Sequence, residues 1–480
     1  MKHVSDIKKY ERCEKLLWCS KRHPQPFQAY IVYNENIIDL SLKRLHIESF
    51  FMGQANDENS AFFTHKEQYT NFINMRFEYQ DLRVKIPIMI KVDDGYHVYY
   101  PYATCFPKEG EAQTMADNEW VLNNLGIQVT KRFCIHLNCN YIRHEDLNLE
   151  ELLLVQDFLF NDRNRPASKI DELVKAKGRD LTPILSKMDE VLKKDEIIKP
   201  RTNICTRRNK CMYFDYCFEE KKDTSIFHLV SSAKKFELYE QGIKTIDELD
   251  FDCIEGTRHQ FAQYMAAKKN ALFFDGLAVE GFFKQVTYPI SYLDFEWETF
   301  AFPPYENMHP YDVLTFQYSL HIEHQDGGLK HKEFLGKNDC RIDFIEKLIE
   351  DIPKQGSIIC YNVEGAEKLR LKQLAKQFPQ YEKPLKAIWE RMVDLAIPFS
   401  SGLIYDNQMA GMYSLKKLVS IFTDYSYDDL EISHGMDAVR KYVNLQNDAD
   451  PEIIDSLLKY CAMDTYAMYL IYHWILEQLK

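Results

Sequence analysis

The sequence lacks three features that would each define a class of protein. It has no apolar run of roughly 18 residues or more, and its most apolar tail, AMYLIYHWIL, is about half of a membrane span. Its start, MKHVSDIKKYERCEKLLW, is too charged for a secretory signal. It has no excess of positive charge, since 60 Lys and Arg against 73 Asp and Glu give a net charge of -13. We therefore expect a cytoplasmic protein without a membrane partner, which does not hold nucleic acid by bulk charge alone.

The rest of the composition is that of an ordinary globular chain. Hydrophobic residues make up 45% and charged residues 28%. A length of 480 residues predicts roughly two to four domains, at about 150 residues each. The 12 cysteines are expected to be thiols or metal ligands, because disulfides are rare in the cytoplasm.

Three stretches of the chain predict a multidomain α/β protein. Residues 1–220 begin with a helical pattern and end in a cysteine cluster, and residues 221–285 form a helical linker. Within the linker, Gly242 predicts a helix end, and Thr245 with Glu248 predicts a capping box. Residues 286–480 show strand, hairpin and strand, then helix and strand in alternation, which is typical of a mixed sheet covered by helices.

Two local signals support this pattern in the last stretch. YDVLTFQYSLHIE and LKHKEFL are separated by HQDGG, which predicts a hairpin that turns at Asp326-Gly327. The strand SIICYN and the helix EKLRLKQLAKQF follow. Asp450 as N-cap and Pro451 at the first helical position predict a long final helix.

The stretch YPISYLDFEWETF, residues 288–300, places carboxylates at alternating positions, 294, 296 and 298. On a strand they share one face, while Phe295 and Trp297 take the other. Like charges in a row repel each other, unless cations lie between them. Mg²⁺ and Mn²⁺ prefer such oxygen ligands.

Two further acidic positions lie far away in the sequence. Glu367 stands near the start of a predicted helix, where an acid commonly compensates the helix dipole. Tyr460 and Asp464 are spaced i, i+4 on the final helix and share one face. Alone, the tyrosine and aspartate also fit an ordinary surface pair or half-buried neighbours.

Together the motifs resemble the DEDD superfamily of exonucleases, which has the RNase H-like fold. The matching positions are Asp294-x-Glu296, Asn362-x-x-x-Ala366-Glu367 and Tyr460-x-x-x-Asp464, in the family's order. Two positions depart from it: most members have Asp at position 367 and an aromatic residue at 366. Both departures bear on rate and metal preference.

The resemblance implies a 3'→5' exonuclease that acts on DNA or RNA with two Mg²⁺ or Mn²⁺ ions. By this analogy the metal ligands are Asp294, Glu296, Glu367 and Asp464, and Tyr460 orients the attacking water. Glu298 either lies at the rim or competes with Glu296, and the Asp-x-Glu spacing favours Glu296.

FQYSLH, RMVDL, GMYSLKKL and YCAMDTYAM resemble a bacterial family known as domain of unknown function 2779, whose members carry a RecB-like N-terminal half. In GMYSLKKL, we expect Ser414 to cap a helix that faces phosphate, with Lys416 and Lys417 nearby. The alternative is a solvated basic helix start.

Cysteines cluster near the end of the first stretch, as Cys205, Cys211 and Cys217 in a C-x5-C-x5-C spacing. This density suggests thiolate ligation, with Cys13 as the fourth ligand and Cys19 as the second choice. The arrangement resembles the iron–sulfur staple of RecB-like nucleases, including the CRISPR-associated exonuclease family, which implies a 4Fe-4S cluster. Zinc and unligated thiols remain alternatives.

A RecB-like active site needs an Asp on one strand and Glu-x-Lys on the next. The strand pair here, LRVKIPIMIKVDDGYHVYYPYATC, turns at Asp94-Gly95 and carries Pro87 and Pro101-Tyr102-Ala103 at those positions. We therefore infer that this half has lost its active site, unless a shifted register brings in an acid, Asp81 or Asp93. Basic side chains contact phosphate or form a solvated face: Lys85, Arg207, Arg208 and Lys210.

A second function remains open. Both nuclease folds would then be inactive, and the protein would bind nucleic acid or act as a scaffold without catalysis.

Overall fold

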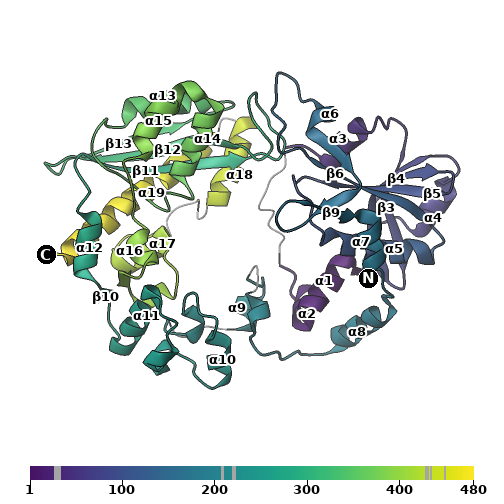
Figure 1. The fold of residues 1–480 in the computed structure, drawn as a ribbon, viewed down its shortest axis with the longest axis horizontal. Coiled ribbons are helices and arrows are strands. Elements are labelled where there is room, and N and C mark those ends of the chain that lie inside the picture. Colours follow the sequence, from purple (N-terminus) through teal and green to yellow (C-terminus); the bar gives the residue numbers. More distant parts are fainter. Residues whose placement is uncertain (26–33, 207–209, 219–222, 428–431, 433–434, 448–449) are drawn as a thin grey trace. The chain divides into compact units, whose positions relative to one another are not determined.

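The computed structural model describes residues 1–25, 34–206, 210–218, 223–427, 432, 435–447 and 450–480. The chain divides into two compact units: the first comprises Met1–Phe214 and Phe300–Asp312, the second Asp215–Thr299 and Val313–Lys480. Each unit packs helices on a mixed sheet, so the prediction of a multidomain α/β protein is confirmed (Figure 1). None of the described helices combines the length and apolar character that a membrane crossing requires.

A sheet in the order β2-β3-β4-β5-β6-β7, with β1 paired to β4, forms the centre of the first unit. Its strands are β1 Lys2–His3, β2 Phe51–Met52, β3 Asn71–Tyr79, β4 Leu82–Val92, β5 Gly95–Tyr102, β6 Val129–Leu137 and β7 Leu153–Gln156. Strands β3, β4 and β5 form an antiparallel meander, and β6 runs parallel to β5. The predicted hairpin is confirmed, but its turn comprises Asp93 and Asp94, because Val92 already pairs with Gly95.

Helices and a small hairpin complete this unit. They are α1 Val4–Arg12, α2 Glu14–Arg22, α3 Ile37–Arg44, α4 Asn59–His65, α5 Glu111–Asn124, α6 Leu149–Leu152, β8 Phe158–Phe160, β9 Pro166–Lys169, α7 Ile170–Lys177, α8 Thr182–Lys193 and the turn η1 Asn203–Cys205. The segment Phe300–Asp312 also belongs here, since Ala301 and Phe302 are buried with Leu40 and Ile135. No pattern in the sequence indicated that this segment packs on the N-terminal half.

Buried charges of the first unit are paired within it. The Asp6 side chain is 2% exposed and accepts hydrogen bonds from Lys21 at 2.6 Å and Lys9 at 3.2 Å. Arg132 contacts both carboxylate oxygens of Glu119. Each buried acid is thus neutralised by a cation of the same unit.

The second unit is built on a sheet in the order β13-β12-β11-β14-β15. The strands are β11 Ile290–Thr299, β12 Val313–Glu323, β13 Leu329–Leu335, β14 Ile358–Cys360 and β15 Met392–Asp394. Strands β11, β12 and β13 pair antiparallel, while β14 and β15 run parallel to β11. The predicted hairpin is confirmed: the His324 amide donates to the Gly328 carbonyl at 2.9 Å, and Gly327 adopts the positive φ of 85° that its turn requires.

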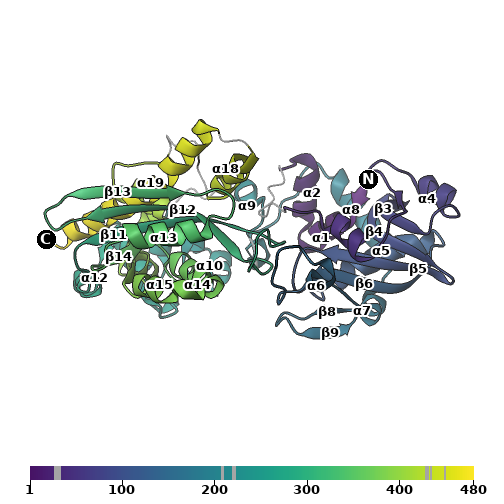
Figure 2. The same ribbon diagram turned by 90° about the horizontal axis from the view of Figure 1, so that it is seen from above.

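Helices cover both faces of this sheet (Figures 1 and 2). One face carries α13 Arg341–Asp351, α14 Glu367–Gln377 and α15 Glu382–Trp389, and the other carries α17 Leu415–Phe422 and α19 Pro451–Gln478. Leu293 and Phe295 are buried against the first group, and Tyr292 is buried against the second. Strand alternation therefore turns the even positions of β11 toward α19.

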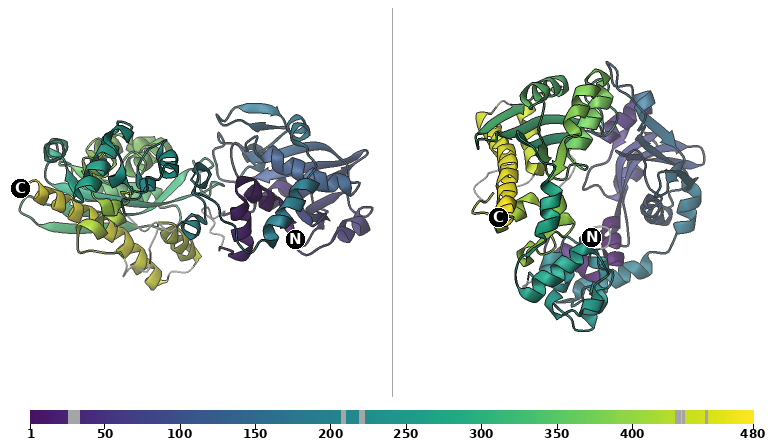
Figure 3. Two further views of the ribbon diagram at one scale, coloured as in Figure 1. Left: turned by 90° about the horizontal axis from the view of Figure 1, so that it is seen from below. Right: turned by 60° about the vertical axis from the view of Figure 1, so that its left-hand side comes forward.

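The final helix α19 crosses the sheet and ends near the C-terminus (Figure 3). The Asp450 side chain accepts a hydrogen bond from the Glu452 amide at 2.9 Å, and Pro451 stands at the first helical position. Both predictions for this helix start are confirmed.

The predicted linker, residues 221–285, falls in the second unit as short elements. These are η2 Ile226–His228, α10 Lys235–Glu240, η3 Ile246–Glu248, η4 Phe251–Cys253, α11 Arg258–Lys269, β10 Phe273–Phe274 and α12 Gly276–Phe283. Gly242 has a φ of 102° just after α10, as predicted for a helix end. The capping box of Thr245 and Glu248 starts a single 3₁₀ turn instead of an α-helix, because the backbone is already extended at Leu249, with φ -63° and ψ 143°.

The remaining elements of the second unit are α9 Phe214–Cys217, which spans the boundary between the units, η5 Pro379–Tyr381, α16 Ile397–Ser400, β16 Ile404–Tyr405, η6 Asn407–Met409 and α18 Gly435–Asn447.

Candidate metal and active site

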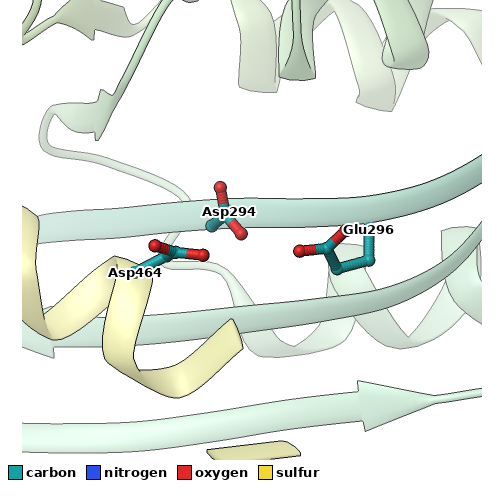
Figure 4. Close-up of side chains that lie close together, drawn as sticks. All are labelled: Asp294, Glu296 and Asp464. Carbon is teal, nitrogen blue, oxygen red and sulfur yellow. The ribbon is translucent and has the colours of Figure 1, made fainter. Parts of the chain in front are cut away.

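Three carboxylates converge in the second unit, from two elements far apart in sequence. Asp294 and Glu296 project from β11, and Asp464 projects from α19, with ligand oxygens all within 4.8 Å of one another (Figure 4). We call these three residues the acidic triad. Glu296 is 8% and Asp464 9% exposed, so little water screens the repulsion between them.

The electrostatics of the acidic triad are unfavourable without a cation. Burial and repulsion from the neighbouring carboxylates raise the pKa of Asp294 and Glu296 well above their ordinary values. Burial raises the pKa of Asp464 to about 6, against the Tyr427 hydrogen bond and the positive charge of Lys416. Among the described residues, no Lys or Arg forms an ion pair with these carboxylates. The donor set suits a hard divalent cation, which binds carboxylate oxygens.

Tyr427 is a site residue that the sequence did not indicate. Its hydroxyl donates a 2.7 Å hydrogen bond to Asp464 Oδ1. The predicted Tyr460 is 4% exposed and lies one turn before Asp464 on α19. The ammonium of Lys416 lies 4.6 Å above the ring of Tyr460 and 5.0 Å from that of Tyr427. The two tyrosines and the lysine thus surround Asp464.

Glu367 stands at the first position of α14 and is 1% exposed. It lies outside the acidic triad, yet burial and the charge of Asp294 raise its pKa well above the ordinary value. Its Oε2 is buried without a hydrogen-bond partner among the described residues. Arg370 lies one turn later on α14, and its positive charge lowers the pKa of Glu367 in part. The guanidinium of Arg370 lies 4.7 Å from the Trp297 ring. Glu367 is therefore an unsatisfied acid near Asp294.

The RMVDL stretch contains Asp394, which supports the loop before Glu367. Its carboxylate accepts hydrogen bonds from the amides of Asn362 at 2.9 Å and Val363 at 3.0 Å. Asn362 has a φ of 62°, which is uncommon for a residue other than glycine. Asp394 thus holds the loop that leads into Glu367.

Cys461 and Glu298 also lie around Asp294 and Glu296. Cys461 is fully buried, and its Sγ lies 3.5 Å from Asp294 Oδ2. Glu298 is 6% exposed, and burial raises its pKa to about 7. It is not part of the acidic triad. Of the two candidates at the strand's end, the structure brings only Glu296 to Asp464.

The expectation for GMYSLKKL needs correction. Ser414 occupies the N-cap position of α17, but its side chain makes no capping hydrogen bond. The backbone carbonyl of Ser414 accepts the first helical hydrogen bond, from the Leu418 amide at 3.0 Å. Lys416 is not part of a solvated helix start either, because α17 buries Leu415 and Leu418 and carries Lys416 onto the aromatic rings of Tyr460 and Tyr427.

The cysteine cluster is only partly assembled. Cys13 lies between α1 and α2, Cys205 ends η1, and the Cys211 amide donates to the Cys205 carbonyl at 2.8 Å. Burial, with smaller contributions from Cys205 and Cys13, raises the pKa of the Cys211 thiol. Cys217 ends α9, and Cys19 is buried in α2. In the part of the chain that the structure describes, no three of these sulfurs lie within 4.8 Å of one another.

The strand pair of the first unit carries no acid at the expected positions. Pro87 lies inside β4, and Pro101-Tyr102 end β5 just before Ala103. Asp81 is tied to the N-terminal amine at 3.2 Å and to Lys2 at 3.0 Å. Asp93 lies in the turn after β4.

Of the four candidate phosphate contacts, Lys85 is exposed on β4, and Lys210 lies 4.8 Å from the Phe214 ring. Arg207 and Arg208 lie outside the described residues.

A family model described as a domain of unknown function (DUF2779) matches residues 291–414. The match confirms the resemblance of this segment, which includes Asp294, Glu296, Glu367 and Asp394 but ends before α19. No curated protein and no solved structure matches the chain.

Proposed function

We propose that the second unit is a metal-dependent nuclease, which hydrolyses phosphodiester bonds of DNA or RNA from the 3' end. The observation that carries this proposal is the acidic triad: three buried or half-buried carboxylates, with ligand oxygens within 4.8 Å of one another. Their repulsion is not offset by ion pairs among the described residues. Such a cluster is stable when divalent cations occupy it.

The sheet supports an RNase H-like fold for this unit. It has five strands, of which only the second in sequence, β12, runs against the others. Its first strand, β11, lies in the centre and carries Asp294 and Glu296. This is the arrangement that the resemblance to DEDD exonucleases implies.

In the proposed hydrolysis, each residue of the site would have a separate role. Asp294, Glu296 and Asp464 would hold Mg²⁺ or Mn²⁺, and Glu367 would complete the ligand set from α14. When bound, two such ions supply an activated water and stabilise the leaving oxygen. Tyr427 fixes one carboxylate of this set through its hydrogen bond. Tyr460 would orient the attacking water.

For the N-terminal half, residues 1–220, we propose an inactive RecB-like domain with a 4Fe-4S cluster on Cys13, Cys205, Cys211 and Cys217. Its support is the proximity of Cys13, Cys205 and Cys211. A closed zinc site, with Zn–S distances of about 2.3 Å, would hold the sulfurs roughly 4 Å apart, and the described thiols do not form such a group. Protein purified without oxygen should be brown and absorb at about 400 nm. Colourless protein with stoichiometric zinc would overturn this assignment.

The nuclease proposal is tested with single-stranded DNA and RNA labelled at the 5' end, in Mn²⁺. Wild-type protein should shorten both or one of them, and Asp464→Asn should not. Glu477→Gln, which changes an exposed acid on the same helix, is the matched control and should behave as wild type. Equal products from wild type and Asp464→Asn would sink the proposal. Binding without any cleavage would favour the non-catalytic, scaffold-like alternative.

A further inference from the structure

Arg370, on α14, is a buried cation without an anionic partner. It is 9% exposed, and it makes neither an ion pair nor a hydrogen bond with any described residue. Its Nε is buried without a hydrogen-bond partner. A guanidinium carries five N–H donors, and arginine is almost never fully buried unless it is paired. The partner of Arg370 is therefore to be sought outside the chain.

Arg341, which begins α13 in the same unit, shows how a buried guanidinium is usually satisfied. It is 1% exposed and donates to both carboxylate oxygens of Asp339, at 2.6 and 2.7 Å, and to Gln377 at 2.8 Å. Arg370 instead has only an aromatic ring, that of Trp297, at 4.7 Å. A ring face attracts a cation but leaves the N–H donors of the guanidinium without acceptors. These donors remain available to a ligand.

Glu367 precedes Arg370 on α14 and does not pair with it. The two positions are spaced i, i+3 and share a helix face, where opposite charges commonly form an ion pair. Yet Glu367 Oε2 and Arg370 Nε are both buried, and both lack a hydrogen-bond partner among the described residues. Opposite charges that stay apart at this spacing can each bind an external group. The group is a cation for Glu367 and an anion for Arg370.

Arg370 adjoins the proposed metal site on its α14 side. The charge of Asp294 helps to raise the pKa of Glu367, because the Glu367 carboxylate lies near the acidic triad. Arg370 follows within one helical turn, which spans about 5.4 Å. The loop that leads into α14 is at the surface, where Asn362 and Gly365 are exposed. A strand bound at the acidic triad can therefore reach α14 from this surface.

Phosphate is the anion that suits this position. Arginine binds phosphate through a planar fork, which donates two parallel N–H bonds. In the proposed site, the carboxylates of the acidic triad and Glu367 would offset the charge of the divalent ions. The phosphates of a bound strand then bring negative charge that needs a further cation, and Arg370 supplies one.

We propose that Arg370 binds a phosphate group of the nucleic-acid substrate, next to the phosphodiester that is cleaved. This inference rests on the proposed nuclease function and adds a substrate-binding residue to it. A purely structural role would have a different signature. If Arg370 only compensated the charge of Glu367, its removal would alter metal binding and leave the salt dependence of DNA binding as in wild type.

The test is binding of labelled single-stranded DNA in Mg²⁺ at several KCl concentrations, measured by fluorescence anisotropy. Phosphorothioate linkages keep the negative charge of the probe and make it resist cleavage. Arg370→Gln should weaken binding roughly 10-fold or more. It should also reduce the slope of log affinity against log salt by about 0.7, the value for one phosphate contact on a single strand. Arg370→Lys should restore the slope but only part of the affinity, since lysine lacks the fork.

Lys372→Gln is the matched control for the loss of one positive charge. Lys372 is an exposed cation of the same helix, and its position is turned by about 200° from that of Arg370. This variant should keep the slope and affinity of wild type. An Arg370→Gln variant with the wild-type slope would overturn the inference, and so would an equal loss of slope in Lys372→Gln.

Thermal unfolding without metal or DNA gives a second readout that does not depend on binding. Arg370→Met removes a charge that has no partner, so it should lower the Tm of the second unit less than Arg341→Met does. Arg341→Met leaves Asp339 without its cation. An equal or larger loss in Arg370→Met would mean that the guanidinium of Arg370 is satisfied within the chain, which would also overturn the inference.

Cleavage of ordinary DNA in Mn²⁺ separates this inference from the nuclease proposal. If wild type cleaves DNA but Arg370→Gln keeps the wild-type salt slope, the nuclease proposal stands and the phosphate contact is lost. If wild type cleaves nothing but Arg370→Gln lowers the slope, Arg370 binds phosphate in a protein that is not a nuclease.

Discussion

Asp6 of the first unit and the acidic triad of the second unit differ in how their negative charge is balanced. In the first unit, Asp6 is neutralised by Lys21 and Lys9 of the same unit. In the second, Asp294, Glu296 and Asp464 lie against one another, without an ion pair among the described residues. A buried acid with a cationic partner is compensated, whereas clustered like charges without one oppose folding. The difference indicates that the carboxylates of the acidic triad are arranged to bind something outside the chain, and divalent cations fit that role.

The largest effect should be on hydrolysis. Asp294→Asn removes a ligand of the acidic triad and should lower the rate at least about 100-fold, since even groups that only support a metal ligand are worth 10- to 100-fold. Asp6→Asn removes a buried acid of the other unit and should leave the rate unchanged. Initial rates on single-stranded DNA with Mn²⁺ check this. Comparable losses in both variants would erase the functional contrast between the units.

Stability without metal should change in opposite directions. Asp6→Asn leaves Lys21 and Lys9 without their partner and should lower the free energy of unfolding of its unit by roughly 1–3 kcal/mol. The loss is below that of a fully buried pair, because both lysines are 33% exposed. Asp294→Asn relieves repulsion and should raise the stability of the second unit by about 1 kcal/mol or more.

Both stability changes can be measured by urea unfolding in EDTA. Hydrogen exchange is the readout, because it reports on each unit separately. Destabilisation of the second unit by Asp294→Asn would mean that the carboxylate is satisfied within the chain.

A smaller effect should come from Tyr427, which positions Asp464. Tyr427→Phe removes one hydrogen bond and should weaken Mn²⁺ binding about 10-fold, as is typical for groups behind a metal ligand. Tyr469→Phe, on α19, is the matched control, because the structure shows no hydrogen bond from its hydroxyl among the described residues. Equal Mn²⁺ affinity of the two variants, measured by calorimetry, would reduce Tyr427 to a packing residue.

The smallest effect concerns pH. Burial would raise the pKa of Asp6, but hydrogen bonds from Lys21, the His3 amide and Lys9 hold it below the ordinary value. The stabilisation by Asp6 is therefore fully present above the unfolded pKa of about 3.9 and is lost as pH falls through the lower folded pKa. The stability difference between wild type and Asp6→Asn should be constant above about pH 4 and shrink below it. Urea unfolding over a pH series would contradict this if the difference grew on acidification.

Local sequence signals predicted much of the secondary structure of the second unit. Alternation in residues 288–300 is a property of neighbouring positions, and it placed Asp294 and Glu296 on one strand face. Asp450 and Pro451 likewise specify a helix start within a few residues. Predictions of this kind hold in the folded protein because they depend only on local backbone geometry.

Tertiary contacts could not be predicted from the sequence. Tyr427 lies in a segment without helix or strand pattern, and only packing brings its hydroxyl to Asp464. Asp394 stood in a noted stretch, RMVDL, but its role depends on the amides of a distant loop. The packing of Phe300–Asp312 on the first unit had no local signal either.

Isothermal titration calorimetry of Mn²⁺ into metal-free protein tests the contrast between the units most directly. Wild type and Asp6→Asn should show saturable binding with equal affinity, and Asp294→Asn should lose it. Absence of binding to wild type, or the same binding isotherm for Asp294→Asn, would contradict the account of the acidic triad as a cation site.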